Sequence, residues 1–249
     1  MLETGAAQGW PIRLVLLIVC SSLAFGCSDA TPTVGGPPAT LVVVSGDAQQ
    51  ATVAQPLSDP IVVRVLDAGG RGIAGVTVVF EAAAGNGTVS PVQIPTDASG
   101  NAQTQWTMDT LAAVNRFLVA RVDNVPLGEA PLVATIHATA LSGPATELRI
   151  VTEPTTAAVS GMPLYVQPSV ELADRYGNLV RQAGVIVSAA IDNVSVDRLS
   201  GTISLPTDSR GVAAFTDLTI TGPAGEVRLV FSAPSLSAVT SSGINLLVN

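Results

Sequence analysis

The chain has 249 residues and a formal net charge of −8 at pH 7, and all 11 of its basic residues are Arg. Without a basic cluster, nucleic acid is not expected as a partner, and neither is a polybasic contact with anionic lipid. Hydrophobic residues make up 47% of the chain and charged residues 12%, with 23 Gly and 17 Pro, a composition that favours short strands and tight turns over amphipathic helices.

The N-terminus has the features of an export signal. Leu14–Gly26 is a mostly apolar run. It is shorter than the ~20 residues that a membrane-spanning helix needs, and it has the length of a signal-peptide core. We therefore predict that the protein is exported.

The run ends in Leu-Ala-Phe-Gly-Cys27, which resembles a bacterial lipobox. The resemblance implies that residues 1–26 are a lipoprotein signal peptide and that Cys27 is lipidated and becomes the mature N-terminus. Ser28 after the cysteine implies delivery to the outer membrane, on its periplasmic face or at the cell surface. A plain secretory signal cut near Gly26 and an uncleaved anchor are the alternatives.

Residues 27–38 are rich in Pro, Gly and Thr and contain few large apolar side chains. Such a composition predicts a flexible tether and not a folded element. Fully extended, the tether would hold the folded part at most about 35 Å from the lipid.

Residues 39–141 are predicted to form a first β-sandwich. Val76, Val78 and Phe80 fall on one face and Thr77, Val79 and Glu81 on the other, which is the period of a strand. The motif Pro-Thr-Asp-x-x-Gly-x-Ala predicts a turn, because Asp97 can bond backbone N–H groups two residues on and Gly100 can take a positive φ. About seven short strands at this spacing are typical of an antiparallel sandwich. The main ones are expected at residues 40–45, 60–66, 76–81, 102–106, 115–122 and 132–140.

Trp106 lies on the strand that follows this turn. It shares one face of that strand with Ala102 and Thr104. We predict that Trp106 is the central side chain of the core. The alternative is an exposed platform for stacking a sugar, although no second aromatic residue lies near it in sequence.

Residues 144–249 are predicted to repeat the first domain, with the boundary at Ser142-Gly-Pro144. The motif Pro-Thr-Asp-x-x-Gly-x-Ala recurs at residues 206–213, and a motif found twice indicates two copies of one unit. Phe215 and Leu218 are both apolar but fall on opposite parities, which predicts a β-bulge between them. Further strands are expected at residues 185–191, 201–205, 212–220, 227–232 and 238–248.

In both halves an opening apolar strand is followed by Asp-x-x-Gly (Asp67–Gly70 and Asp174–Gly177), another apolar strand and Thr-Asp-x-x-Gly-x-Ala. In this order the chain resembles the bacterial immunoglobulin-like domains of invasin and intimin type, well over 39–141 and more loosely over 144–249. The resemblance implies an all-β chain with two tandem immunoglobulin-like antiparallel β-sandwiches after a signal peptide and tether. It implies no catalytic residues, because these modules have none, and it indicates fold better than function.

The side chains that carry common enzyme chemistry are scarce. His137 is the single histidine, and no Gly-x-Ser-x-Gly motif accompanies it as a possible nucleophile. Both cysteines lie in the first 27 residues, so the folded part has neither a thiolate metal site nor a disulfide. Two carboxylates could support glycosidase chemistry, but few aromatic residues exist to line a sugar cleft. We predict a protein that is not an enzyme and uses no cofactor, with His137 as a partly exposed strand residue.

The turn aspartates leave one further alternative. Oxygen ligands from neighbouring turns can share a calcium ion, whereas a turn aspartate commonly serves only to close its own turn. No dense Asp-x-Asp-x-Asp loop is present, so we expect no metal site. The residues concerned are Asp67, Asp97, Asp174 and Asp208.

These features predict a non-catalytic cell-envelope lipoprotein that acts in adhesion or binding, or as a structural spacer. Its partners would be the membrane, through lipid on Cys27, and a protein or surface-glycan ligand. The alternatives are an accessory subunit of an envelope protein complex and a carbohydrate-binding module. Binding is expected at loops of the far end of the second domain or at an exposed strand edge. The candidate loop residues are Arg175, Tyr176 and Asn178, because Tyr and Arg are favoured contact residues.

Overall fold

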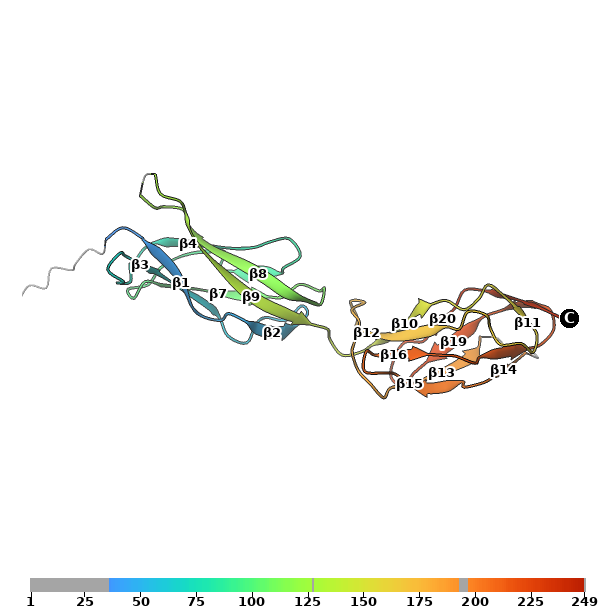
Figure 1. Ribbon diagram of the computed structural model, residues 1–249. Coiled ribbons are helices and arrows are strands. Elements are labelled where there is room, and N and C mark those ends of the chain that lie inside the picture. The colour runs from blue at the N-terminus through green and yellow to red at the C-terminus, as the bar shows by residue number, and fades with distance from the viewer. Residues whose placement is uncertain (1–35, 127, 193–196, 249) are drawn as a thin grey trace, which may run out of the picture. The chain divides into compact units, whose positions relative to one another are not determined.

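The computed structural model describes residues 36–126, 128–192 and 197–248 (Figure 1). Every regular element in these ranges is a β-strand, and the ranges contain no helix that could span a membrane. The predicted signal peptide, Cys27 and tether residues 27–35 lie outside the described residues, so what was expected of them stays a prediction.

The first nine strands form a sandwich of two sheets, one of four strands and one of five. Neighbouring strands run antiparallel, except for one parallel pair at an edge of the larger sheet. The strands are β1 (Thr40–Ser45), β2 (Gln49–Thr52), β3 (Ile61–Leu66), β4 (Thr77–Ala82), β5 (Thr88–Ser90), β6 (Gln93–Pro95), β7 (Asn101–Thr107), β8 (Ala113–Val122) and β9 (Leu132–Leu141).

The outer strands of this sandwich are shared between its two sheets. β1 pairs with β3 in the smaller sheet, and β2 continues from it to pair with β9 in the larger sheet. On the opposite side, β5 pairs with β7 and β6 pairs with β4. Since exposed sheet edges invite further strands, this sharing keeps every edge short. The arrangement is that of an immunoglobulin-like sandwich.

The buried faces of the first sandwich follow the alternation in the sequence. On β4, Val78 and Phe80 are fully buried, and the residues between and beside them are more exposed. On β7, Trp106 points inward, and its side chain is 0% exposed. Its indole Nε1–H donates to the carbonyl of Asn86 at 2.8 Å. Trp106 is therefore the core residue that the sequence predicted, and the sugar-platform alternative for it is wrong.

Twelve further strands, in sheets of three, three, four and two, form a second sandwich whose main strand pairings correspond to those of the first. They are β10 (Glu147–Thr152), β11 (Ala157–Val159), β12 (Ser169–Ala173), β13 (Ile186–Ile191), β14 (Arg198–Ser200), β15 (Ser204–Pro206), β16 (Val212–Ala214), β17 (Thr219–Thr221), β18 (Gly225–Val227), β19 (Leu229–Ser232), β20 (Val239–Thr240) and β21 (Ile244–Leu247).

The strand pairings of the second sandwich correspond to those of the first. β10 pairs with β12, and β11 continues from β10 to run parallel to β21. β14 pairs with β17 and β15 with β13, as the corresponding strands do in the first sandwich. The predicted change of parity after β16 is confirmed, because Phe215 and Leu218 are both buried. A break between β16 and β17 takes the place of the expected β-bulge.

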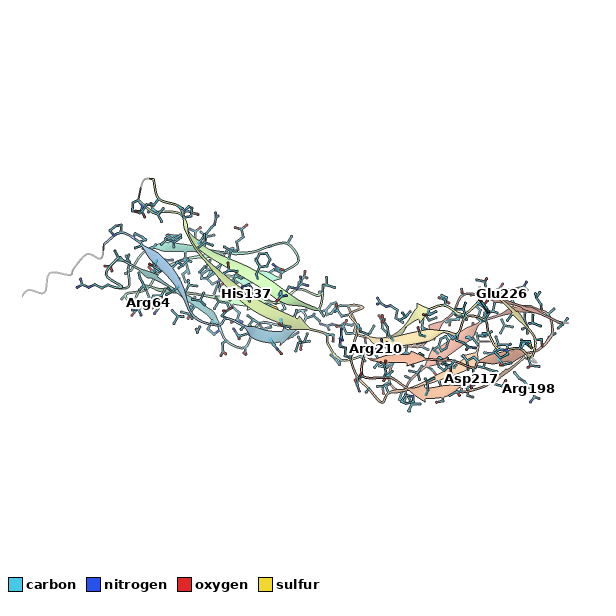
Figure 2. All side chains as sticks on the ribbon, in the orientation of Figure 1. Arg64, His137, Arg198, Arg210, Asp217 and Glu226 are labelled. Carbon is cyan, nitrogen blue, oxygen red and sulfur yellow. The ribbon has the colours of Figure 1, made fainter. Side chains whose placement is uncertain are left out.

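Asp217 lies within this break. Its carboxylate accepts hydrogen bonds from the backbone N–H and the hydroxyl of Thr202, at 2.8 and 2.9 Å. Figure 2 shows Asp217 on the second sandwich. The Asp217 side chain therefore holds the segment that contains Thr202.

Each sandwich has a hydrophobic core of its own. One cluster of buried side chains runs from Leu41 to Ala140, and the other runs from Leu148 to Leu246. In the second core, the rings of Phe215 and Phe231 lie 5.4 Å apart between centroids. The predicted fold class of two tandem immunoglobulin-like sandwiches is thus confirmed, while the domain limits 39–141 and 144–249 stay predictions.

Candidate functional site

The loop that the sequence singled out is the turn after β12. Arg175 is exposed, and its guanidinium lies 4.6 Å from the centroid of the Tyr176 ring. The same guanidinium donates to the Tyr176 hydroxyl at 2.5 Å. Tyr176 is 39% exposed. These two predicted residues therefore form one exposed pair, and a role for the pair in binding stays a prediction.

Asn178, the third candidate in this loop, is placed differently. Its side chain is 6% exposed. The amide Nδ2 donates to both oxygens of the Asp174 carboxylate, at 3.1 and 3.0 Å. Asn178 thus holds the turn together from inside, and its amide does not project beside Arg175 and Tyr176.

One turn geometry occurs four times among the residues that the structure describes, twice in each sandwich. In each case an Asp accepts hydrogen bonds through Oδ1 from the backbone N–H groups two and four residues on, and a Gly three residues on has a positive φ. The aspartates are Asp67, Asp97, Asp174 and Asp208. The accepted N–H groups belong to Gly69 and Arg71 at 2.8 and 2.9 Å, Ser99 and Asn101 at 2.8 and 2.9 Å, Tyr176 and Asn178 at 2.9 and 3.0 Å, and Arg210 and Val212 at 2.8 and 3.0 Å.

The second carboxylate oxygen of two of these aspartates holds the segment that enters each sandwich. Oδ2 of Asp67 accepts the N–H of Gly36 at 3.3 Å, and Oδ2 of Asp174 accepts the N–H of Gly143 at 2.8 Å. The Arg175–Tyr176 pair therefore lies at the end of the second sandwich where the chain enters. The expectation that this candidate loop lies at the far end of the second sandwich is therefore wrong.

These hydrogen bonds lower the pKa of all four carboxyls below the ordinary value. For Asp67, Asp97 and Asp208, the backbone N–H four residues on is the largest cause of the lowered pKa. For Asp174, burial raises the pKa, but the hydrogen bonds from Asn178, Gly143 and Tyr176 together lower the pKa by more. Each shift has a local structural cause, as expected of aspartates that close their own turns.

We expect the free energy of unfolding to fall as the pH is lowered below about 4. A carboxyl with a lowered pKa in the folded state stabilises the fold fully above the unfolded-state pKa, and this stabilisation is lost as the pH falls through the folded-state pKa. Urea unfolding followed by circular dichroism, between about pH 6 and pH 2, measures the effect. Asp97→Asn with Asp208→Asn keeps an acceptor oxygen in both turns and should flatten the curve. An unchanged curve would contradict this account of the turns.

The remaining candidates are His137 and possible metal ligands. His137, labelled in Figure 2, lies on β9. It is exposed and is paired across the sheet with Phe117. Its backbone N–H donates to the Asp47 carboxylate at 2.7 Å. Its position as an exposed strand residue is confirmed. Within the described ranges, no group of three or more His, Cys, Asp or Glu is placed to hold a metal ion.

The structure also has an exposed apolar hollow that the sequence reasoning missed. It lies on the second sandwich and has a volume of about 510 Å³. Tyr165 and Met162, which the first copy replaces by Ser58 and Gln55, could have revealed it through an alignment of the two halves. The lining residues are Ala157, Ala158, Val159, Met162, Pro163, Tyr165 and Leu247.

Comparison with known proteins gives one family match, on the second sandwich. Residues 143–249 match the model described as SMCHD1 Ig-like domain 6. No curated protein matches the chain.

Several solved structures are similar to most of the chain. The Yersinia pseudotuberculosis adhesin InvE has 18% identity and a TM-score of 0.36, with 85% of this chain and 60% of InvE covered. The D00-D0 domain of intimin has 17% identity and a TM-score of 0.40, with 83% of this chain and 99% of that one covered. A glycosyl hydrolase family 2 member from Bacteroides cellulosilyticus has 14% identity and a TM-score of 0.36, with 81% of this chain and 24% of the hydrolase covered.

The chain is thus similar to the immunoglobulin-like domains of invasin and intimin type, as its repeated motifs predicted. It spans 60% of the length of InvE. At these identities the likeness extends to the fold alone.

Proposed function

We propose that this protein is a non-catalytic binding or spacer module of the cell envelope, held to the membrane by lipid on Cys27. The observation that carries the proposal is where the carboxyl groups with lowered pKa values lie and what they bind. Perturbed pKa values mark catalytic candidates when they gather in a cleft. Here the four shifted carboxyls sit in four separate turns and bind their own backbone. This arrangement supports a rigid scaffold, on which loops and strand surfaces make the contacts.

A pull-down distinguishes a binding or spacer module from an accessory subunit of an envelope complex, through the proteins that are recovered with the chain. The lipidated full chain is isolated from the envelope, and the proteins that accompany it are identified. Attachment of the purified chain to whole cells or matrix supports adhesion. Stable recovery of one envelope protein in equal amount, without such attachment, would instead make it an accessory subunit of that complex.

The anchor has its own test. We expect Cys27→Ser to move the protein from the detergent phase to the aqueous phase in phase partitioning. Two or three acyl chains hold a protein on a membrane, and the serine variant would carry none. Cys20→Ser is the matched control and should partition like the wild type. A Cys27→Ser protein that stays in the detergent phase would rule out lipid on this cysteine.

A further inference from the structure

The turn after β12 also contacts the first sandwich, through the side chain of Asn178. Both sandwiches belong to the same compact unit of the chain. The amide Nδ2 of Asn178 donates to the carbonyl of Thr110 at 2.8 Å, and its Oδ1 accepts the N–H of Ala112 at 2.8 Å. Thr110 and Ala112 lie in the loop between β7 and β8. One side chain of the second sandwich thus uses its donor and its acceptor on the backbone of the first.

This contact is shielded from water. Asn178 is 6% exposed, and Asp174, to which its amide also donates, is 1% exposed. Hydrogen bonds are stronger where water does not compete for the same groups. The bonds of Asn178 to the first sandwich are therefore expected to persist, which is not usual for polar contacts on a protein surface.

The loop that Asn178 contacts is fixed to the first sandwich. The carbonyl of Asp109 accepts the N–H of Ala54 at 3.0 Å, and the guanidinium of Arg116 donates to the carbonyl of Leu111. These bonds hold the loop on both sides of the carbonyl to which Asn178 donates. Little conformational entropy is therefore lost when the contact forms.

The connection between the sandwiches is fixed as well. It consists of residues 142–146, between β9 and β10. The N–H of Gly143 donates to Asp174 Oδ2, and the N–H of Thr146 donates to the carbonyl of Ala173, each at 2.8 Å. Neighbouring domains usually move relative to each other unless a contact restrains them. Here the Asp174 turn restrains both the connection and the loop of the first sandwich.

The first sandwich shows that the turn itself does not require an amide at this position. Its turn from Asp67 to Arg71 has the same backbone hydrogen bonds as the turn from Asp174 to Asn178, so Arg71 corresponds to Asn178. Arg71 is exposed. A residue without an amide side chain thus completes the turn, and the bonds to the first sandwich are what Asn178 adds.

We propose that Asn178 fixes the joint between the two sandwiches, so that they move as one body. The joint is the contact of the Asp174 turn with the β7–β8 loop, together with the connecting residues 142–146. A neutral amide and backbone groups make the contact, so added salt should not weaken it. The inference goes beyond the proposed function, and it holds equally for a binding module and for a spacer.

Distances between two spin labels, measured by pulsed electron paramagnetic resonance, test the joint. The full chain carries Cys20→Ser and Cys27→Ser, so that only introduced cysteines are labelled. Val133→Cys and Val151→Cys place one label on each sandwich, at side chains that are 57% and 56% exposed. We expect a narrow distribution of distances. Asn178→Ala should broaden it, because the loss of two hydrogen bonds raises the ratio of open to closed joints by about tenfold.

Two controls separate the joint from the fold of the second sandwich. Val151→Cys with Ile186→Cys places both labels on the second sandwich, and Asn178→Ala should leave this distance distribution unchanged. Arg71→Ala alters the corresponding position of the first copy, and it should leave the distribution between the sandwiches narrow.

Three results would overturn the proposal. The first is a distribution between the sandwiches that is as broad with Asn178 as with alanine in its place. The second is a changed distribution within the second sandwich, because Asn178 would then support its own turn and not the joint. The third is a distribution that narrows only when millimolar calcium is added, since carboxylate ligands would then hold the joint.

Discussion

Trp106→Ala should lower the free energy of unfolding of the first sandwich by about 3–5 kcal/mol, which is the usual cost of truncating a buried aromatic ring. The side chain is 0% exposed and lies within the main buried cluster. Its removal opens a cavity and also deprives the buried Asn86 carbonyl of the indole N–H at 2.8 Å. Urea unfolding followed by far-ultraviolet circular dichroism measures the change.

Trp106→Phe separates the cavity from the lost hydrogen bond, and Val133→Ala is a control at an exposed position. Trp106→Phe keeps most of the ring volume and should cost less than the alanine variant. Val133→Ala removes an apolar side chain that is 57% exposed, and we expect it to change the free energy of unfolding by no more than about 0.5 kcal/mol. Equal losses for Trp106→Ala and Val133→Ala would refute a central role for the tryptophan.

Gly211→Ala should lower the free energy of unfolding of the second sandwich by about 2–5 kcal/mol. Gly211 is the glycine of the repeated turn motif and has a φ of +81°. A Cβ atom there would lie 2.0 Å from the carbonyl oxygen of Val180, so the backbone must move as well as accept a strained φ. Unfolding in urea, monitored through the second sandwich, gives the magnitude.

Gly161→Ala isolates the strain from the collision. Gly161 has a φ of +79°, almost that of Gly211, but no atom lies within 4 Å of the position of its Cβ. We expect it to cost about 1–2 kcal/mol, the penalty of the left-handed conformation alone. If both alanine variants lost the same free energy, the collision at Val180 would have no part in the effect.

Alternation of side chains predicted the strands that have one buried face. Phe80 and Trp106 could be placed in the core from sequence because the residues around them alternate over a full strand. The duplicated Asp-x-x-Gly turns were equally predictable, since each one is closed by hydrogen bonds within five residues. Local chemistry decides such features, and the sequence contains all of it.

Features decided by distant partners could not be predicted in this way. No strand was expected between residues 45 and 60, yet Gln49–Thr52 is a strand because β9, far along the chain, supplies its hydrogen-bond partners. Asn178 was expected to be a contact residue of the loop, and it is buried, with its amide bonded to the carboxylate of Asp174.

The parallel pair at the edge of each sandwich bears on how the molecule responds to pulling. β2 lies near the start of the first sandwich and runs parallel to β9, at its end, and β11 and β21 repeat the arrangement. When force draws the two ends of a sandwich apart, these strands slide along each other, and their hydrogen bonds are loaded in shear together. An antiparallel hairpin pulled at its open end would instead unzip one bond at a time. Each sandwich is therefore built to bear tension between its ends.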